Sequence, residues 1–273
     1  MAPILTDPGE SSLIAAIEEN LVALFRSTSH CSEFELHDEP DMLWAITNVR
    51  SWPLVNSIVR AGLDEHSADH AIEAAIQQAR SRNVGLMWWV GPSASPKDLC
   101  SRLLAHGFVT AGSVSGMAMD LGQLPPDTTA TADLSVAEVK NVSQLATWSH
   151  ICAAGFGMPA DAEAIWLSWF GSMGIGSDIP IRHYIGWWKG EPVATSTVLF
   201  AAGVAGIYNV ATLPEARGRG IGAALTIAPL RDALLAGYQV SILQSSEMGL
   251  GVYRRIGFQE HCTFNLYAWS DKA

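Results

Sequence analysis

The chain has 273 residues, of which 49% are hydrophobic and 16% charged, and its formal net charge is −11. This length allows one large domain or two small ones, and the composition is too apolar for a disordered chain. An acidic surface repels phosphates, which argues against general binding to nucleic acid or to anionic membranes. An anionic ligand therefore needs a local basic site.

The N-terminal stretch MAPILTDPGESS lacks the basic and apolar regions of a secretory signal, so we expect a soluble, cytoplasmic protein. The chain has no C-x-x-C pair, and its four cysteines are scattered: Cys31, Cys100, Cys152 and Cys262. This spacing favours neither a zinc site nor a disulfide framework, and we expect reduced thiols and no bound metal.

The first half ends in a clear series of elements. A helix is predicted over 66–82, then a strand over 85–91, a helix over 96–106, the pair Gly107-Phe108, and a strand to Asp120. His66 and His70 lie four residues apart at the start of the first helix, a spacing that could share a metal. No third ligand is convincing, so a solvated helix start is favoured.

A segment rich in Pro, Thr and Asp, 122–133, has the composition of a linker and divides the chain near its middle. We therefore expect two domains, residues 1–127 and residues 128–273.

The second half alternates strands with helices, which predicts a mixed α/β or α+β sheet. The expected strands are 134–139, 183–189, 193–200, 204–211, 240–244 and a last one ending at 269, and the expected helices are 142–153, 161–170, 220–236 and 249–256. The apolar run 192–213 is long enough to span a bilayer. Its polar interruptions and the turn-like Ala201-Ala202-Gly203 favour a hairpin of two buried strands instead.

Both halves end alike, with a long helix, a strand, a short helix, Gly-Phe and a final strand. LLAHGF in the first half lies opposite YRRIGF in the second, which suggests a degenerate internal duplication.

Chemistry is concentrated in residues 210–225, VATLPEARGRGIGAAL. A buried strand ends here, and a glycine-rich loop leads into a helix. The consecutive backbone N–H groups of the loop and the positive end of the helix dipole then point to the same place. From residue 217 to residue 255, five arginines stand against two carboxylates. This pattern predicts an anion site; a glycine-rich turn with surface arginines is the plainer alternative.

Gly218, Gly220 and Ala223 also match the dinucleotide-binding pattern G-x-G-x-x-G/A. That pattern places its first glycine directly after the strand, and Glu247 is too far along to supply its acidic residue. A nucleotide-dependent oxidoreductase is therefore a weaker alternative.

The loop RGRGIG, followed by a helix, a strand and the Y-x-x-x-G-F of Tyr253–Phe258, resembles the GNAT superfamily of acyl-CoA-dependent N-acyltransferases. The resemblance covers 134–269, and the first half looks like a second copy without the loop. It implies an α/β (α+β) fold of two tandem GNAT-like domains, each a mixed, mostly antiparallel sheet flanked by helices. Residues 128–273 would be catalytic, and residues 1–127 structural or substrate-covering.

The resemblance also implies site residues. The backbone of Val210, Ala211 and Thr212 would bind the pantetheine arm of acetyl-CoA, and Ser246 stands where many members have an asparagine that bonds the cofactor. Tyr253 is the candidate general acid for the leaving thiolate, and a tyrosine packed on the sheet is the alternative. The pyrophosphate would be held by the loop residues Arg217, Gly218, Arg219, Gly220, Ile221 and Gly222.

A general base is harder to assign. Some family members have a glutamate at the position aligned with Gly206; the alternatives here are Tyr208, His183, Asp178 and Glu163. The aromatic residues of 166–173 stand where the family covers its acceptor, although core packing is equally consistent.

The function expected from the resemblance is transfer of an acetyl group from acetyl-CoA, as co-substrate, to an amine of a small molecule. The expected partners are acetyl-CoA and that amine, with no nucleic acid and no membrane. A non-catalytic CoA-binding or interaction module is the alternative from another class.

Overall fold

The computed structural model describes residues 3–6, 9–125, 133–176 and 178–271. Most of the predicted linker, 126–132, lies outside these residues. The chain divides into two compact units: unit 1 comprises residues 1–20 and 115–261, and unit 2 comprises residues 21–114 and 262–273.

Unit 1 is built on a mixed, mostly antiparallel sheet with the strand order β5-β10-β9-β8-β7-β6. Only β9 and β10 run parallel; the other neighbours are antiparallel. The strands are β5 (Val109–Asp120), β6 (Leu134–Glu138), β7 (Ile181–Trp188), β8 (Glu191–Ala201), β9 (Val204–Thr212) and β10 (Val240–Ser245). The predicted hairpin in 192–213 is confirmed: β8 and β9 are joined by a turn in which Ala202 and Gly203 have positive φ.

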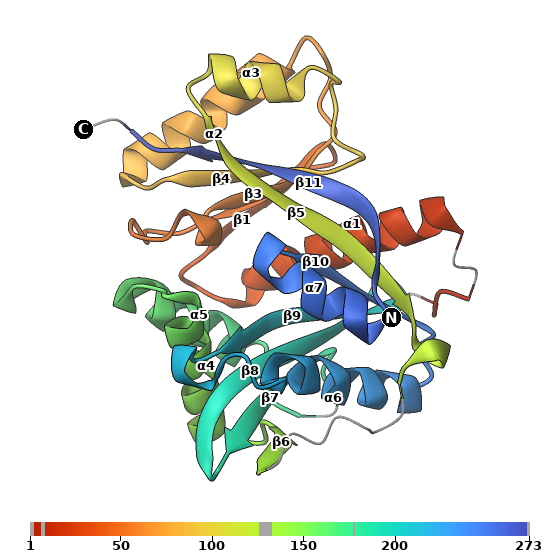
Figure 1. Cartoon of the computed structure of the whole chain (residues 1–273). Coiled ribbons are helices and arrows are strands. Elements are labelled where there is room, and N and C mark those ends of the chain that lie inside the picture. Colours follow the sequence, from red (N-terminus) through yellow and green to blue (C-terminus); the bar gives the residue numbers. More distant parts are fainter. Residues whose placement is uncertain (1–2, 7–8, 126–132, 177, 272–273) are drawn as a thin grey trace. The chain divides into compact units, whose positions relative to one another are not determined.

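Helices cover both faces of this sheet (Figure 1). The ring of His183 on β7 lies 4.3 Å from that of Trp148 on α4, whereas the hydroxyl of the next residue, Tyr184, donates to Asp232 on α6 at 2.6 Å. Successive strand residues point to opposite faces, so α4 and α6 lie on opposite faces. The helices of unit 1 are α4 (Val142–Phe156), α5 (Ala160–Ser172), α6 (Ile221–Leu235), α7 (Glu247–Ile256) and the first part of α1 (Glu10–Arg26).

Local signals set the helix ends. Asn141 caps α4, because its side-chain oxygen accepts a hydrogen bond from the N–H of Gln144 at 2.9 Å, and Gly157 ends the helix in the left-handed conformation with φ 68°. Helix α6 continues through Pro229 to Leu235.

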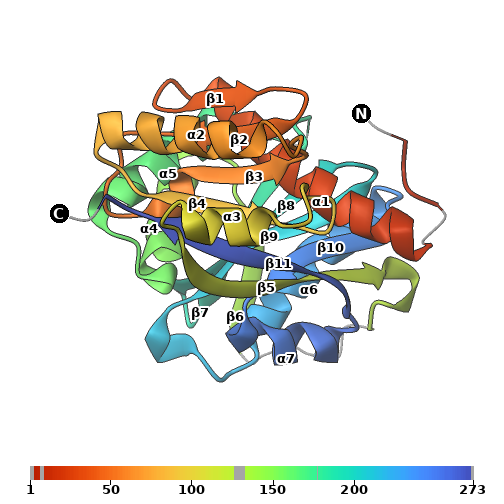
Figure 2. The same cartoon turned by 90° about the horizontal axis from the view of Figure 1, so that it is seen from above.

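The strands of unit 2 have the order β1-β2-β3-β4-β11, and the unit has its own core. The strands are β1 (Glu35–Asp38), β2 (Met42–Ile46), β3 (Ser57–Ala61), β4 (Leu86–Val90) and β11 (Gln259–Trp269). Helices α2 (Ala68–Arg82) and α3 (Leu99–Ala105) pack on this core, and Figure 2 shows both beside β3 and β4. Short 3-10 turns occur at Ser27–His30, Pro53–Val55, Leu121–Gln123 and Pro214–Ala216.

Each predicted half of the chain completes the sheet of the other unit. Residues 115–120 of β5 pair with β10 in unit 1, and residues 265–269 of β11 pair with β4 in unit 2. The final strands of the two repeats are therefore exchanged, a long-range pairing that local sequence patterns do not reveal. The roles assigned to residues 1–127 and 128–273 stay predictions.

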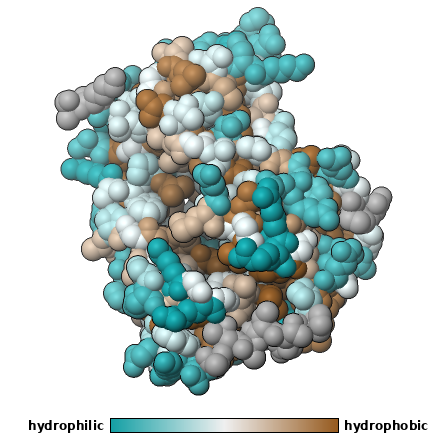
Figure 3. Space-filling view, viewed as in Figure 1, coloured by the Kyte–Doolittle hydropathy of each residue, from teal (hydrophilic) through white to brown (hydrophobic). Residues whose placement is uncertain are grey.

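The most exposed large hydrophobic side chains of the described residues are Leu235, whose neighbour Leu234 is also exposed, Met248 and Val142. Figure 3 shows hydrophobic residues mixed with hydrophilic ones on the face drawn. Within the described ranges, none of the helices combines the length and the hydropathy that crossing a bilayer requires.

Candidate functional site

Strands β9 and β10 separate in the middle of unit 1. They pair only at Ala205–Ile207 and Ser241–Leu243, although β9 continues to Thr212 and β10 to Ser245. The edge of 208–212 that faces β10 therefore has backbone groups without a strand partner on that side. This separation places Val210, Ala211 and Thr212 beside a gap between the two strands.

A bulge in β9 lies at the start of the gap. Asn209 has φ 53°, and the register with β8 shifts between Thr195 and Thr197. Thr195 donates its hydroxyl to the Asn209 carbonyl at 2.9 Å, and the Asn209 amide donates to the Thr197 hydroxyl at 3.3 Å. Bulges redirect a strand near functional sites. Asn209 was not predicted as a site residue; its signal in the sequence is an asparagine inside an apolar strand, since Asn tolerates the left-handed region.

The predicted anion loop lies at the end of the same strand. Gly218 and Gly220 have φ 75° and 78°, conformations that favour glycine, and α6 begins directly after Gly220. Among the described residues, the N–H groups of Gly218, Gly220, Ile221 and Gly222 have no acceptor. Such a cradle fits a pyrophosphate.

Arg217 holds this loop in place. Its Nε donates to the Thr212 carbonyl at 3.0 Å and its Nη2 donates to the Gly155 carbonyl near the end of α4 at 2.9 Å. The guanidinium thus ties strand, loop and helix together, and its positive charge remains beside the cradle. The guanidinium of Arg219 lies 4.7 Å from the ring centroid of Trp188.

Tyr253 lies on α7, near the end of β10. A Cβ on Gly249 would lie 2.8 Å from the Tyr253 ring and 3.2 Å from Ser245 Oγ, so glycine there lets the ring lie close to the end of β10. The Tyr253 hydroxyl has no hydrogen bond to any described residue, and burial raises its pKa to about 12. The phenol is therefore protonated at neutral pH, and its O–H can donate a hydrogen bond to a ligand. Ser246 is exposed at the start of α7, and its side chain does not cap the helix.

Gly206 stands at the position where some family members have a basic glutamate, and a side chain from α1 fills the space beside it. A Cβ on Gly206 would lie 2.0 Å from Oδ1 of Asn20, a fully buried residue of α1. Tyr208 donates its hydroxyl to the same Oδ1 at 2.8 Å, and burial raises its pKa, so it is no base. His183 is enclosed under α4 and α5, and desolvation lowers its pKa to about 3.

The other two alternatives for the general base are the carboxylates of Glu163 and Asp178. Glu163 forms an ion pair with the exposed His150 at 3.1 Å, and Asp178 is exposed. Of the aromatic residues on α5, Trp169 and Phe170 are buried and stack at 4.9 Å, which is core packing; Trp166 is only partly buried.

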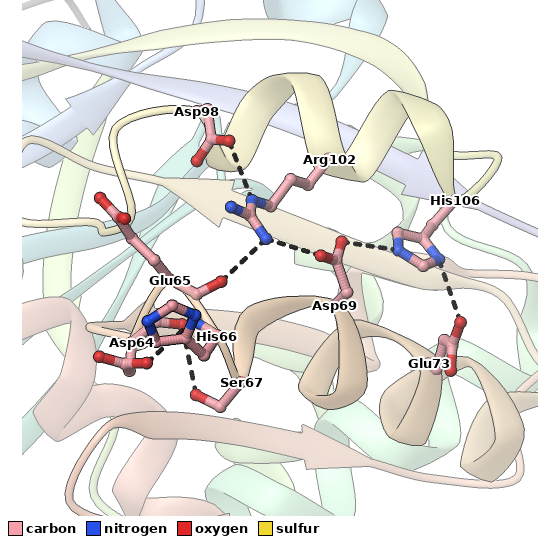
Figure 4. A network of polar contacts seen from close by, with 9 residues as sticks. All are labelled: Asp64, Glu65, His66, Ser67, Asp69, Glu73, Asp98, Arg102 and His106. Atoms are coloured by element: carbon pink, nitrogen blue, oxygen red, sulfur yellow. Dashed lines mark hydrogen bonds and ion pairs between the residues drawn. The ribbon is translucent and has the colours of Figure 1, made fainter.

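Unit 2 has a different arrangement where its own helix begins. Figure 4 shows Arg102 of α3 donating to Asp69 in the first turn of α2 at 2.6 Å, with His106 on the other carboxylate oxygen at 2.9 Å. Hydrogen bonds from His106 and the charge of Arg102 lower the pKa of Asp69. The N–H of His66 donates to Asp64 at 2.9 Å. The described residues contain no cluster that could hold a metal ion.

The comparisons with known proteins agree with this geometry. Residues 181–260 match the sequence model of a family described as an acetyltransferase (GNAT) domain. No curated protein matches the sequence.

Solved structures share the fold over almost the whole chain. A GCN5-related N-acetyltransferase from Kribbella flavida has a TM-score of 0.69 at 18% identity, covering 95% of this chain and 96% of its own. One from Sphaerobacter thermophilus has a TM-score of 0.62 at 20% identity, covering 85% and 81%. A tandem GNAT protein from the clavulanic acid biosynthesis pathway has a TM-score of 0.60 at 12% identity, covering 100% and 98%. The predicted fold class and the resemblance to the GNAT superfamily are confirmed.

Proposed function

We propose that this chain, which has the fold of a tandem GNAT protein with its GNAT domain match at residues 181–260, transfers an acetyl group from acetyl-CoA to an amine of a small molecule. The catalytic part is assigned to residues 128–273, and residues 1–127 are assigned a structural or substrate-covering role. A cytoplasmic location belongs to the same proposal.

One observation carries this proposal: β9 and β10 part after Ile207 and Leu243, and β9 then leads directly into the cradle of N–H groups at the start of α6. A ligand with an extended arm and a pyrophosphate fits such a groove, because the strand edge offers backbone hydrogen bonds and the helix start offers an anion site. Acetyl-CoA has both parts.

The residues take the following roles. Backbone groups of Val210, Ala211 and Thr212 bond the pantetheine arm, and an N–H here polarises the thioester carbonyl and stabilises the oxyanion. The N–H groups of Gly218, Arg219, Gly220, Ile221 and Gly222 hold the pyrophosphate. Arg217 keeps the loop in position and adds its charge.

Tyr253 donates a hydrogen bond to the leaving sulfur and transfers its proton as the C–S bond breaks. Its hydroxyl has no protein partner to give up among the described residues. Ser246 is close in sequence to Ser245 at the end of β10, and we assign it a contact with the pantetheine arm.

Calorimetry with acetyl-CoA, CoA and NAD tests the donor. We expect acetyl-CoA and CoA to bind and NAD not to bind; binding of NAD alone would overturn this proposal in favour of a nucleotide-binding protein. A thiol-release assay with a panel of amines then tests transfer. Acetyl-CoA binding without thiol release from any amine would reduce the protein to a CoA-binding module.

A further inference from the structure

A group of neutral polar side chains lies at the point where the strands separate. Tyr208 and Gln244 are the first residues beyond the last pair of β9 and β10, and Asn20 joins them from α1. Gln244 donates to the carbonyl of Ile17 on α1 at 3.3 Å, and its amide also donates toward the Tyr208 oxygen, which has a second lone pair. We call Asn20, Tyr208 and Gln244 the Asn20 group.

Gly206 makes room for this arrangement. Any side chain there would collide with Asn20, because its Cβ would lie 2.0 Å from Oδ1 and 2.8 Å from Cγ. Ala205 and Ile207 belong to the core under α6, so Gly206 and Tyr208 face the opposite side of the sheet. The Asn20 oxygen therefore occupies the place of a side chain on β9.

The hydrogen bonds fix the direction of the Tyr208 hydroxyl. The Asn20 amide donates to the Ala201 carbonyl at 2.8 Å and to the Leu199 carbonyl at 3.4 Å, which turns its oxygen toward Tyr208. Tyr208 then donates its only proton to that oxygen at 2.8 Å. A phenol oxygen that donates its proton still has a lone pair to accept a hydrogen bond.

The charge of these side chains determines which protonation state of an amine the Asn20 group can bind. Asn20 is fully buried, Tyr208 stays protonated because burial raises its pKa, and Gln244 is neutral. Thr197 and Asn209, in the bulge beside them, are neutral as well. An ammonium brought against this group would lose its hydration without gaining a countercharge from it, whereas a neutral N–H donor would gain the Tyr208 oxygen.

We propose that the site takes its acceptor as a neutral nucleophile, and that Tyr208, fixed by Asn20, receives it by accepting a hydrogen bond from its N–H. This inference rests on the proposed function of unit 1. The acceptor class is an amine of low basicity, such as an aromatic amine or a hydroxylamine.

The step balances without a protein base. The nitrogen lone pair forms the C–N bond to the thioester carbon, the C–S bond breaks, and its electron pair leaves with the sulfur, which Tyr253 protonates. The extra proton on nitrogen passes to water, and water restores the proton of Tyr253. Tyr208 orients the nitrogen and exchanges no proton.

The test uses matched probes with the full-length protein. Hydroxylamine and 4-methoxyaniline are largely neutral near pH 7, whereas methylamine and benzylamine are of similar size and protonated. Thiol release from acetyl-CoA is measured with each, after subtraction of the rate without enzyme. We expect kcat/KM to be at least about tenfold higher for the neutral member of each pair, as one well-placed hydrogen bond allows.

Tyr208→Phe keeps the ring and removes the accepting oxygen. We expect kcat/KM for the neutral probes to fall about tenfold, with the Kd of acetyl-CoA and the melting temperature little changed. Asn20→Ala leaves the Tyr208 hydroxyl in place but unfixed and should lose rate in the same direction. Tyr184→Phe is the matched control, because it removes a buried tyrosine hydroxyl bonded to Asp232 on the opposite face, and it should leave the acceptor kinetics unchanged.

Three results overturn the inference while leaving acetyl-CoA binding intact: preference for the protonated probes, transfer to none of the four, or a folded Tyr208→Phe that behaves like Tyr184→Phe. Loss of acetyl-CoA binding in the wild-type protein would instead overturn the proposed function.

Discussion

Tyr253→Phe separates a catalytic tyrosine from a structural one. The ring packs against Gly249 and lies 6.0 Å from the ring of Phe258, and the substitution keeps both contacts. The hydroxyl bonds to no described residue, so its removal forfeits no internal hydrogen bond. We expect the free energy of unfolding to change by no more than about 0.5 kcal/mol.

The expected effect on turnover is much larger. A free thiol has a pKa of about 8.5, and burial raises the pKa of Tyr253 to about 12. The same low-polarity surroundings disfavour the departing thiolate and raise the pKa of its thiol also. The difference between the pKa of the phenol and the pKa of the thiol is therefore smaller than in water. Loss of the donor should lower kcat by about 10²–10⁴-fold, the range for general acid–base catalysis.

The raised pKa also fixes the pH dependence. The phenol stays protonated from about pH 7 to about pH 10, so its contribution to kcat should be flat there. Its folded pKa lies above the unfolded value, so the folded state binds more protons between the two. The free energy of unfolding should therefore fall as the pH rises from about 10 through about 12, and Tyr253→Phe should remove that part of the decline.

Three measurements decide the question: kcat by thiol release per folded molecule, the melting temperature, and the Kd of acetyl-CoA. Near-wild-type kcat in a folded Tyr253→Phe would refute the catalytic role and leave water or a substrate group as the proton source.

Four further changes test other parts of the site. Gly220→Ala places a Cβ where φ is 78°, at about 1–2 kcal/mol of strain, and should weaken acetyl-CoA binding in calorimetry; equal affinity would remove the loop from the site. Arg217→Gln loses the bonds to the Thr212 and Gly155 carbonyls, so the melting temperature and acetyl-CoA affinity should fall together, and a fall in neither would contradict its tying role. Gly206→Ala collides with Asn20 and should cost about 1–3 kcal/mol in denaturant unfolding. Adding Asn20→Ala should recover part of that loss, and strict additivity would argue against the collision. A fragment of residues 128–273 lacks β5 and residues 1–20 and should show no cooperative melting by circular dichroism, whereas a folded, CoA-binding fragment would show that the exchanged strand is dispensable.

Local patterns predicted those elements whose signals lie within a few residues. The strands predicted over 183–189 and 193–200 formed β7 and β8, with a turn at Lys189 and Gly190 between them, and the interrupted apolar run formed β8 and β9. The glycine-rich loop at the start of α6 was predicted from its own residues, because glycines directly before a helix indicate left-handed backbone and free N–H groups.

The rest of the site depends on residues that are distant in sequence. Asn20 and Tyr208 are 188 positions apart, and Arg217 and Gly155 are 62 apart. No residue near Asn20 in the sequence indicates that its side chain fills the space over Gly206. The backbone carbonyl that accepts the hydrogen bond from Arg217 likewise has no sequence motif. The same holds for the exchange of β5 and β11, because the apolar pattern of a strand does not identify its partner.

The starts of α6 and α2 differ in a way that explains why we propose an anion site in only one unit. In α6, left-handed glycines leave N–H groups without an acceptor among the described residues, and the carboxylate of Asp232 lies at the other end of the helix, bonded to Tyr184. In α2, Asp69 places a carboxylate in the first turn, where the helix dipole favours negative charge, and Arg102 and His106 hold it there. A phosphate approaching α2 meets a charge of its own sign in the position it would need. The helix dipole that we propose to bind an anion in unit 1 is satisfied from within the chain in unit 2, so the first repeat keeps the fold without the proposed anion site.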